Sequence, residues 1–241
     1  MKKKIIENSK TLLYALLIAL IIRSVLFQPF YIPSSSMEPN LLVGDRLFVS
    51  KYSYGYSRHS LPFSPKIYDK RIMSKNPERG DVIVFKTPAD NRTDYIKRLI
   101  GLPGDIIQII NEDLYLNNQV VKKIKIQDSG IIRCGDEILP VNFYKEILPN
   151  GKEYIAVYRK DGSMKNTSKF IVPENHFFFL GDNRDCSKDS RYLTSVGYVN
   201  FNNLVGKAQV IFFSNDITVG SFFKIWKWNK SLRFNRFFKR I

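Results

Sequence analysis

The stretch Tyr95-Ile96-Lys97-Arg98-Leu99-Ile100-Gly101-Leu102-Pro103-Gly104-Asp105 holds an apolar strand and a turn rich in glycine and proline, and a second apolar run follows at residues 106–110. Short apolar runs bounded by Gly, Pro, Asn or Asp are typical of β-strands. The same pattern recurs at residues 82–85, 114–116, 177–180 and 208–213. We therefore expect a mostly β fold.

A lysine interrupts the apolar strand at residues 95–100. Side chains alternate along a strand, so Tyr95, Lys97 and Leu99 share one face. Burial lowers the pKa of a lysine, and a shift from about 10.4 to about 8 costs roughly 3 kcal/mol. A lysine that is neutral in this way can accept a proton. The alternative is a lysine that extends from a strand edge into solvent. Because Arg98 follows, we expect one of the two cations to be exposed.

A serine cluster, Ser34-Ser35-Ser36-Met37, lies upstream of this lysine. A serine hydroxyl is a weak nucleophile until a base takes its proton, and that base is usually a histidine. The chain has two histidines, His59 in a loop-like stretch and His176 at the start of a strand. Either histidine remains open as the base, but a Ser36/Lys97 dyad fits the local sequence better.

The only long apolar segment covers residues 12–27 and is interrupted by Arg23 alone. At about 1.5 Å per residue it reaches roughly 24 Å, short of a hydrocarbon core of about 30 Å unless flanking residues join it. No small-residue cleavage site follows, so we favour an uncleaved anchor over a cleaved signal peptide or a buried core helix. The positive-inside rule places the N-terminus in the cytoplasm, because Lys2, Lys3, Lys4 and Lys10 precede the segment.

The net charge of +16 favours an anionic partner, either nucleic acid or a membrane surface. Basic residues are densest after residue 220, where they alternate with Trp and Phe and no acid interrupts them. These residue types suit the membrane interface, although they also bind single-stranded nucleic acid. Because of the anchor, we expect membrane lipid and no nucleic acid as partner.

A third segment, residues 181–191, interleaves acids and bases directly after an apolar strand. Such a segment is usually a solvated loop, but this one also suits a buried polar network that fixes catalytic groups. Cys134 and Cys186 are too few for a disulfide framework; one bridge is possible in an oxidising compartment, but their spacing gives no support for it. We expect both to be free thiols, and we expect no metal and no cofactor.

These segments together resemble bacterial type I signal peptidases, the leader peptidases of the S26 family. Ser34-Ser35-Ser36-Met37-Glu38-Pro39 is similar to the family's Ser-x-Ser-Met-x-Pro box. Residues 94–105 resemble its Tyr-x-Lys-Arg box with the following Gly-x-Pro-Gly-Asp. Residues 181–191 resemble its Gly-Asp-Asn-Arg-Asp-x-Ser-x-Asp-Ser-Arg box. The order of the boxes and the N-terminal anchor also match, so the resemblance covers most of the chain outside residues 120–169 and the tail.

The resemblance implies roles for individual residues. Ser36 is implied as nucleophile and Lys97 as general base, with the Ser34 hydroxyl and the Ser36 amide forming the oxyanion hole. Ser187 is implied to hydrogen-bond and orient Lys97, and Asp189 and Arg191 to form a supporting salt bridge. The implied pockets for small substrate side chains are lined by Ile32, Pro33, Met37, Leu41, Tyr95 and Ile96.

Three positions depart from the family pattern. Asn40 stands where threonine is usual, Cys186 where asparagine is usual, and Asn200 where a proline commonly follows the Gly-x-Val element. None of the three belongs to the proposed dyad, but the loop around Cys186 and the substrate contacts near Asn40 are put in question.

The expected protein is a membrane-bound serine endopeptidase that cleaves signal peptides from exported preproteins at the outer face of a bacterial inner membrane. Two alternatives are a self-cleaving Ser/Lys protease of the repressor type and a non-catalytic basic membrane adaptor. The sequence does not indicate an oligomeric state. The expected parts are a cytoplasmic N-terminus (1–10), a transmembrane anchor (11–27), a catalytic β domain in two segments (28–119 and 171–220), a smaller inserted β subdomain in the polar, irregular stretch (120–170), and a membrane-proximal tail (221–241).

Overall fold

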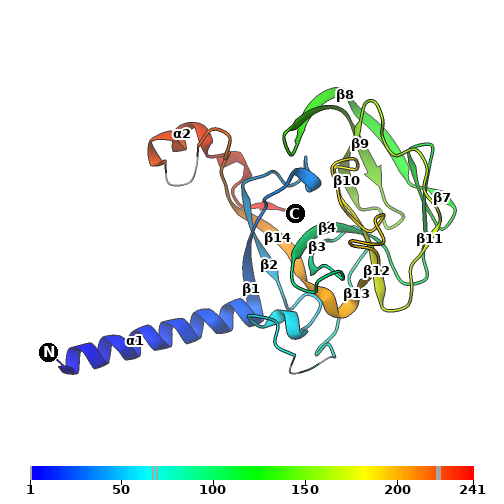
Figure 1. Ribbon diagram of the computed structural model, residues 1–241. Helices are drawn as coiled ribbons and strands as arrows, with labels where there is room; N and C mark the ends of the chain where they lie inside the picture. Colours follow the sequence, from blue (N-terminus) through cyan, green and yellow to red (C-terminus); the bar gives the residue numbers. More distant parts are fainter. Residues whose placement is uncertain (1, 67, 69, 221–223) are drawn as a thin grey trace.

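The computed structural model describes residues 2–66, 68, 70–220 and 224–241. A long N-terminal helix projects from a body built almost entirely of β-strands (Figure 1). The expectation of a mostly β protein with one long helix is confirmed. Phe222 and Phe223, which we counted in the aromatic tail, lie outside the described residues.

The largest sheet has the strand order β1-β2-β14-β3-β4-β12-β13, and β15 pairs with β14. Neighbouring strands in it are antiparallel. Its strands are β1 (Phe27–Tyr31), β2 (Asp45–Ser50), β3 (Val82–Lys86), β4 (Asp94–Gly101), β12 (His176–Leu180), β13 (Val199–Asn200), β14 (Leu204–Ser214) and β15 (Lys239–Arg240).

Two smaller antiparallel sheets complete the body. One has the order β11-β5-β6-β7 and the other β10-β9-β8. Their strands are β5 (Ile106–Ile110), β6 (Asp113–Leu116), β7 (Gln119–Val120), β11 (Phe170–Ile171), β8 (Lys122–Cys134), β9 (Glu137–Ile147) and β10 (Glu153–Arg159). All six apolar runs predicted as strands are strands, namely β3, β4, β5, β6, β12 and β14.

The stretch at residues 120–169 was expected to form a smaller inserted β subdomain, although no individual strand was predicted within it. It contains β8, β9 and β10, which pair over long antiparallel registers. Several exposed positions of these strands carry Lys, Glu or Arg, and these charged residues interrupt the apolar runs from which strands were predicted. A sheet with one solvated face tolerates such residues, so its strands are less apolar than buried ones.

The sequence also failed to predict β1 and β2. Pro29 lies within β1, and proline in a strand is confined to sheet edges because it has no N–H to donate. In agreement, β1 is an edge strand of the large sheet. β2 places Asp45 in a buried position, where the carboxylate pairs with Arg236 of the C-terminal tail.

The N-terminal helix α1 (Lys2–Ile21) continues as a π-helical turn over Ile22–Leu26. Its candidate membrane span is Glu7–Leu26, 20 residues long, which at about 1.5 Å per residue matches a hydrocarbon core of about 30 Å. Flanking residues therefore extend the shorter apolar segment to a full span. Large apolar side chains along the helix remain exposed, Leu12 by 62% and Ile18 by 57%.

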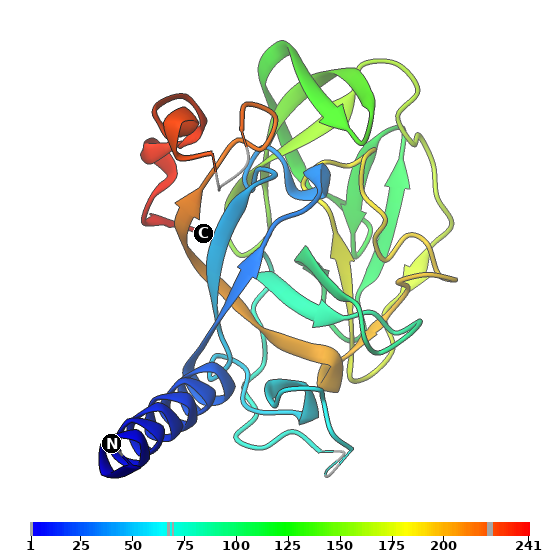
Figure 2. The same ribbon diagram turned by 60° about the vertical axis from the view of Figure 1, so that its left-hand side comes forward.

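The C-terminal tail is tied to the main sheet. Arg236 is buried against Asp45, and Arg233 forms an ion pair with Asp216 at 2.9 Å. The short helix α2 (Trp228–Ser231) lies in this tail. In both views α1 and the tail extend from the same side of the β body (Figures 1 and 2).

Strand β4 is covered on both faces, which is why its side chains are buried. Leu99 packs in one cluster with Phe85 and Phe179. Ile100 packs in another cluster with Phe178 and with residues of β5, β6 and β10. The face that begins at Tyr95 therefore points into the core of the large sheet, as strand alternation predicts.

A buried ion pair joins the β8–β10 sheet to the segment after β12. Arg184 donates two parallel hydrogen bonds to Glu146 of β9, at 2.7 and 2.6 Å. The Tyr154 and Tyr158 hydroxyls of β10 donate to the same carboxylate, at 2.6 and 2.5 Å. Both charged side chains are nearly inaccessible, at 2% for Arg184 and 1% for Glu146. This network attaches the smaller sheet to the loop at residues 181–191.

Removing the carboxylate charge should test that attachment. We expect Glu146→Gln to lower the free energy of unfolding by about 3–5 kcal/mol, because it leaves the buried Arg184 guanidinium without its countercharge. Urea unfolding in non-ionic detergent measures the change, and the exposed Glu137→Gln is the matched control. A loss below about 1 kcal/mol, as for a surface pair, would contradict the role given to this network.

Candidate active site

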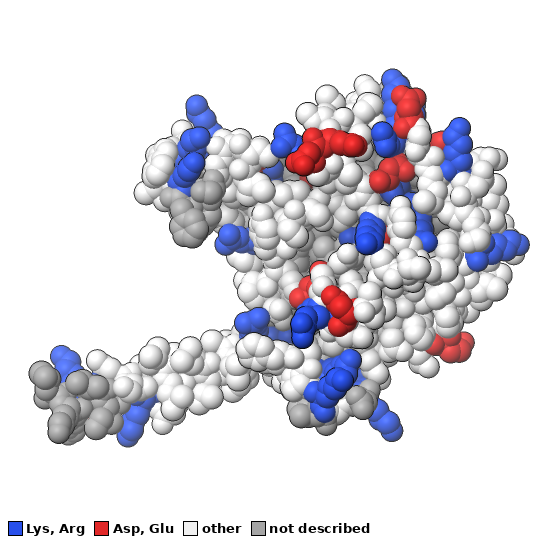
Figure 3. All heavy atoms as spheres, in the orientation of Figure 1, with Lys and Arg blue, Asp and Glu red and all other residues white. Residues whose placement is uncertain are grey.

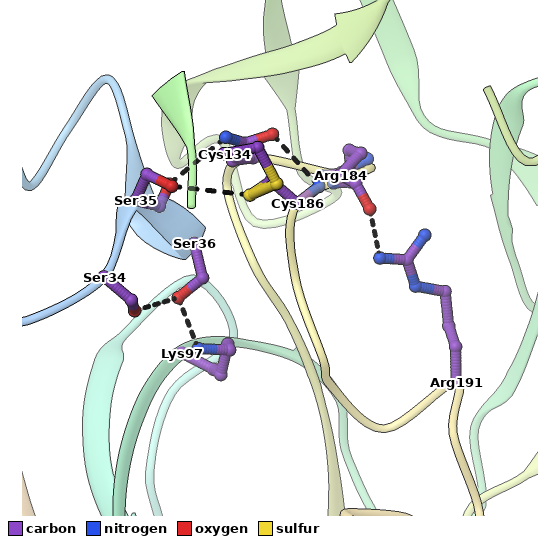
Figure 4. The surroundings of a disulfide bond; sticks show 9 residues. Ser34, Ser35, Ser36, Lys97, Cys134, Arg184, Cys186 and Arg191 are labelled. Carbon is purple, nitrogen blue, oxygen red and sulfur yellow. Dashed lines mark hydrogen bonds between the residues drawn. A yellow bond between two sulfur atoms is a disulfide. The ribbon is translucent and has the colours of Figure 1, made fainter. Parts of the chain in front are cut away.

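Ser36 and Lys97 meet in the interior of the protein (Figure 4). Ser36 lies in a 3-10 turn, Ser35–Met37, that follows β1, and Lys97 lies in the middle of β4. Lys97 Nζ is 2.7 Å from Ser36 Oγ, and the two residues are only 4% and 6% exposed. The Asn183 amide donates to the Ser36 carbonyl at 3.1 Å, which fixes the turn against the loop after β12.

Burial controls the protonation of Lys97. It lowers the pKa of the ammonium group from 10.5 to about 8, while the negative charges of Asp189 and Asp182 oppose the shift. No carboxylate among the described residues forms a salt bridge with Lys97. Its Nζ donates instead to the Ile96 carbonyl at 2.8 Å and lies 5.3 Å from the centre of the Tyr95 ring. A substantial fraction of this lysine is therefore neutral slightly above neutral pH.

Arg98 is buried as well, so the expectation that one of the two neighbouring cations is exposed was wrong. Arg98 is 8% exposed and binds Asp182 through two hydrogen bonds of 2.7 Å. A buried arginine is tolerated when a carboxylate meets its guanidinium in this bidentate way. Because Arg98 binds Asp182, the negative charge of this carboxylate is partly neutralised. Asp182 therefore raises the pKa of Lys97 less than an unpaired carboxylate would.

Asp189 and Arg191 form the pair that the sequence predicted. Arg191 Nε lies 2.8 Å from Asp189 Oδ1, and both side chains are buried. Asp189 also accepts the Gly181 amide at 3.0 Å. The Arg191 charge holds the pKa of the Asp189 carboxyl below its usual range, together with the hydrogen bonds it accepts and against the effect of burial. Through these contacts Asp189 holds Gly181, at the start of the loop at residues 181–191, against Arg191 at its end.

The other two predicted serines lie beside the dyad. Ser34 Oγ is 3.3 Å from Ser36 Oγ, so this hydroxyl lies next to the nucleophile. Ser187 is buried, and its Oγ has no hydrogen-bond partner among the described residues, so the hydrogen bond predicted between Ser187 and Lys97 is not formed. Ser187 packs instead against Gly181, where an added Cβ would lie 2.2 Å from Ser187 Oγ and 2.5 Å from the Ser36 carbonyl oxygen.

The residues predicted to line substrate pockets divide into two groups. Ile32, Met37 and Leu41 are at most 2% exposed and pack in the core with residues of β2, β3 and β14. Pro33, Tyr95 and Ile96 keep accessible surface. Only the second group is therefore accessible from the surface, and the first group is part of the core.

Neither histidine reaches the serine. His59 Nδ1 lies 3.0 Å from Ser64 Oγ, and His176 Nδ1 lies 2.8 Å from the Glu174 carbonyl oxygen. Burial and the nearby arginines lower the pKa of His59 to about 4. Among the hydrogen bonds of residues 2–66, 68, 70–220 and 224–241, Ser36 Oγ is joined to Lys97 and Ser34 and to no imidazole. The same ranges contain no cluster of His, Cys, Asp or Glu that could hold a metal ion.

A family model described as "Signal peptidase, peptidase S26" matches residues 5–213, which is most of the chain. The chain belongs to this family. Signal peptidase I of Rickettsia prowazekii (strain Madrid E) is 42% identical over 246 residues, covering 95% of this chain and 90% of the relative. Signal peptidase I of Rickettsia bellii (strain OSU 85-389) is 40% identical over 252 residues, covering 98% and 85%. The protein is therefore a serine endopeptidase.

A solved structure of a signal peptidase I from Enterococcus faecalis V583 is 26% identical. It covers 55% of this chain and 97% of its own length, with a TM-score of 0.33.

Asn40, which replaces the threonine usual in this family, has defined partners. Its amide group donates to Asp182 Oδ2 and to the Ile155 carbonyl of β10, each at 2.7 Å. Asp182 thus connects the turn after Ser36, strand β4 through Arg98, and the smaller sheet. Sequence analysis did not single out Asp182. The signal that could have found it is an acid two residues after the apolar strand that ends at Leu180.

The cysteines are not free thiols, as we had expected, but form a disulfide between Cys134 and Cys186 (Figure 4). Their Cα atoms are 5.7 Å apart although 52 residues separate them in sequence. The bond joins the end of β8 to the loop at residues 181–191, and Cys186 Sγ lies 3.4 Å from Ser35 Oγ. Because β8 was not predicted, nothing in the sequence indicated that its end lies against this loop.

The disulfide should stabilise the region around the dyad. We expect the double change Cys134→Ser with Cys186→Ser to lower the free energy of unfolding by about 2–4 kcal/mol, since the bond restricts the unfolded chain. Urea unfolding without reductant measures the difference. Dithiothreitol should bring the wild-type protein to the stability of the variant and leave the variant unchanged. Equal stability of the oxidised wild type and the variant would contradict this assignment.

Proposed function

We propose that the protein cleaves signal peptides from exported preproteins, with Ser36 as nucleophile and Lys97 as general base. The contact of 2.7 Å between a buried serine hydroxyl and a buried lysine without an acidic partner supports the proposal most directly. Membership of the signal peptidase family supports the substrate class.

The reaction follows from this geometry. Neutral Lys97 takes the Ser36 proton as Ser36 Oγ attacks the scissile carbonyl, which gives a tetrahedral oxyanion. The Ser34 hydroxyl and the Ser36 N–H are the proposed donors to that oxyanion, and one such donor contributes about 3–4 kcal/mol. Lys97 then protonates the leaving amine. In the second half of the reaction it takes a proton from water as the water attacks the acyl-enzyme, and it returns this proton to Ser36 Oγ as the acyl–oxygen bond breaks.

The arginine pairs support the base electrostatically. Asp182 and Asp189 are the charges that raise the pKa of Lys97, and each is held by its own arginine, Arg98 and Arg191. Two unpaired carboxylates at these positions would raise the pKa of Lys97 further and would leave less of the neutral base. We propose that Arg98 and Arg191 are positioning residues in this sense, and that Ser187 supports the dyad by packing against Gly181, which also lies against the Ser36 carbonyl.

We propose that the substrate lies along Pro33, Tyr95 and Ile96, backed by Ile32, Met37 and Leu41. A shallow surface over a filled core excludes large side chains, because no cavity behind it can accept them. Alanine at the residue before the cut, and small or aliphatic side chains two residues further back, fit such a surface.

We propose that α1 anchors the protein in a membrane, with the N-terminus in the cytoplasm and the β body outside it. The lysines at the start of the chain favour this orientation. The disulfide favours it as well, because disulfides persist in oxidising compartments. The tail forms a second membrane contact, since Trp226, Phe234 and Phe238 are 73%, 63% and 77% exposed and extend from the same side of the body as α1.

The dyad is tested by mutation. Because Ser36 and Lys97 act as one unit, Ser36→Ala, Lys97→Ala and the double change should abolish cleavage to a similar extent, without additivity. His59→Ala and His176→Ala should retain cleavage. A labelled preprotein incubated with each purified variant in detergent gives the rates and the cut site. Near-normal turnover by Lys97→Ala would exclude the mechanism and would mean that another residue is the base.

The pH dependence is a separate test. The pKa of Lys97 lies near 8, below its ordinary value, so the neutral base accumulates as the pH rises through about 8. The kcat/KM for a preprotein should therefore increase through an apparent pKa near 8 and level off above it. A histidine base would give a rising limb near pH 6.5, and such a limb would contradict Lys97 as the base.

A further inference from the structure

A large cavity lies at the junction between the end of the helix and the β body, away from Ser36. It has a volume of about 790 Å³ and is bordered by the helix end, the segment after β2 and the turn between β3 and β4. Basic side chains dominate its lining: Arg23, Lys51, Arg58, Lys66, Lys86 and Arg92. The space-filling view shows Lys and Arg side chains gathered where the helix meets the body (Figure 3).

The positive charge around the cavity is not balanced by the described residues. Two acids line it, Asp90 and Asp94. Asp94 pairs with Lys86 at 2.9 Å, and Asp90 accepts hydrogen bonds within its own turn from Thr87 and from backbone amides. In the described part of the chain, no carboxylate forms a salt bridge with the remaining five basic residues; Asp69 lies outside that part. An anion in the cavity would offset this excess of charge.

Lys51 provides the strongest argument for an anion bound in this cavity. It is 2% exposed, and its Nζ donates to the Ser60 carbonyl. Burial lowers its pKa to about 8, the positive charges of Arg23 and Lys86 add to the shift, and the negative charge of Asp94 opposes it. The ion pair of Asp94 is with Lys86, so Lys51 has no carboxylate of its own among the described residues, and a buried ammonium in that position is costly. A phosphate oxygen in the cavity would supply a countercharge and a further acceptor.

The position of the cavity indicates where the phosphate comes from. Arg23 lies three residues before Leu26, the last residue of the candidate span, and so at the level where phospholipid headgroups meet the hydrocarbon core. Phe63, on the rim of the same cavity, is fully exposed. An exposed aromatic ring beside clustered cations is suited to the membrane interface. We propose that this cavity binds the phosphate of an anionic phospholipid headgroup and thereby fixes the β body against the membrane surface.

The proposal is tested on the full chain by native mass spectrometry from non-ionic detergent, with equimolar phosphatidylglycerol and phosphatidylcholine. We expect one phosphatidylglycerol to be retained in preference to phosphatidylcholine. The triple change Arg58→Gln, Lys66→Gln and Arg92→Gln should lower the lipid-bound fraction about tenfold or more. The control Lys122→Gln, Arg133→Gln and Lys160→Gln removes the same charge from exposed positions on the β8–β10 sheet and should leave it within about twofold.

Further arms separate the remaining explanations. If the triple variant does not fold, the single exposed change Arg92→Gln should still weaken lipid retention. An equal loss in the pocket and control variants would mean that only net charge matters and would overturn the proposal. Displacement of the lipid by low millimolar inorganic phosphate would assign the cavity to free phosphate and would overturn the lipid assignment. Retention of both lipids without preference would overturn it as well.

Discussion

The burial of Lys97 is the constraint on which the rest of the site depends. A lysine can act as a base only when its neutral form is populated, and in this protein desolvation supplies the shift. Desolvation requires that β4 be covered on both faces, which the aromatic cluster with Phe85 and Phe179 and the second cluster with Phe178 achieve. The strand order of the large sheet contributes to this burial, because β4 lies between β3 and β12 and is not an edge strand.

The loop at residues 181–191 brings several charged side chains into this low-dielectric interior, and each of them has an oppositely charged partner. Asp182, Arg184 and Asp189 are all buried, and each is paired with an opposite charge, Arg98, Glu146 and Arg191 respectively. The pairing leaves Lys97 as the buried cation beside the nucleophile without a carboxylate of its own. The disulfide at Cys186 and the hydrogen bonds of Asn183 to the serine turn hold the loop in register with Ser36.

Much of this arrangement could be predicted from the sequence because it depends on short-range patterns. Apolar runs with turn residues predict β3, β4, β5, β6, β12 and β14, and strand alternation places Tyr95 and Lys97 on one face. The features that could not be predicted depend on contacts between distant segments. The Cys134–Cys186 bond and the Arg98–Asp182 pair form only once β8 and the loop at residues 181–191 lie beside other strands. Strand β8 was itself not predicted, because lysines interrupt its apolar residues.

The protonation of Lys97 is the most direct test of this account. Nitrogen-15 NMR of the full chain labelled with 15N-lysine, with the resonance assigned by its loss in Lys97→Arg, follows the Nζ shift as the pH is raised. The account predicts a midpoint near pH 8 for Lys97. A midpoint near 10.5, the ordinary value for lysine, would mean that the side chain remains an ammonium at working pH and cannot be the base.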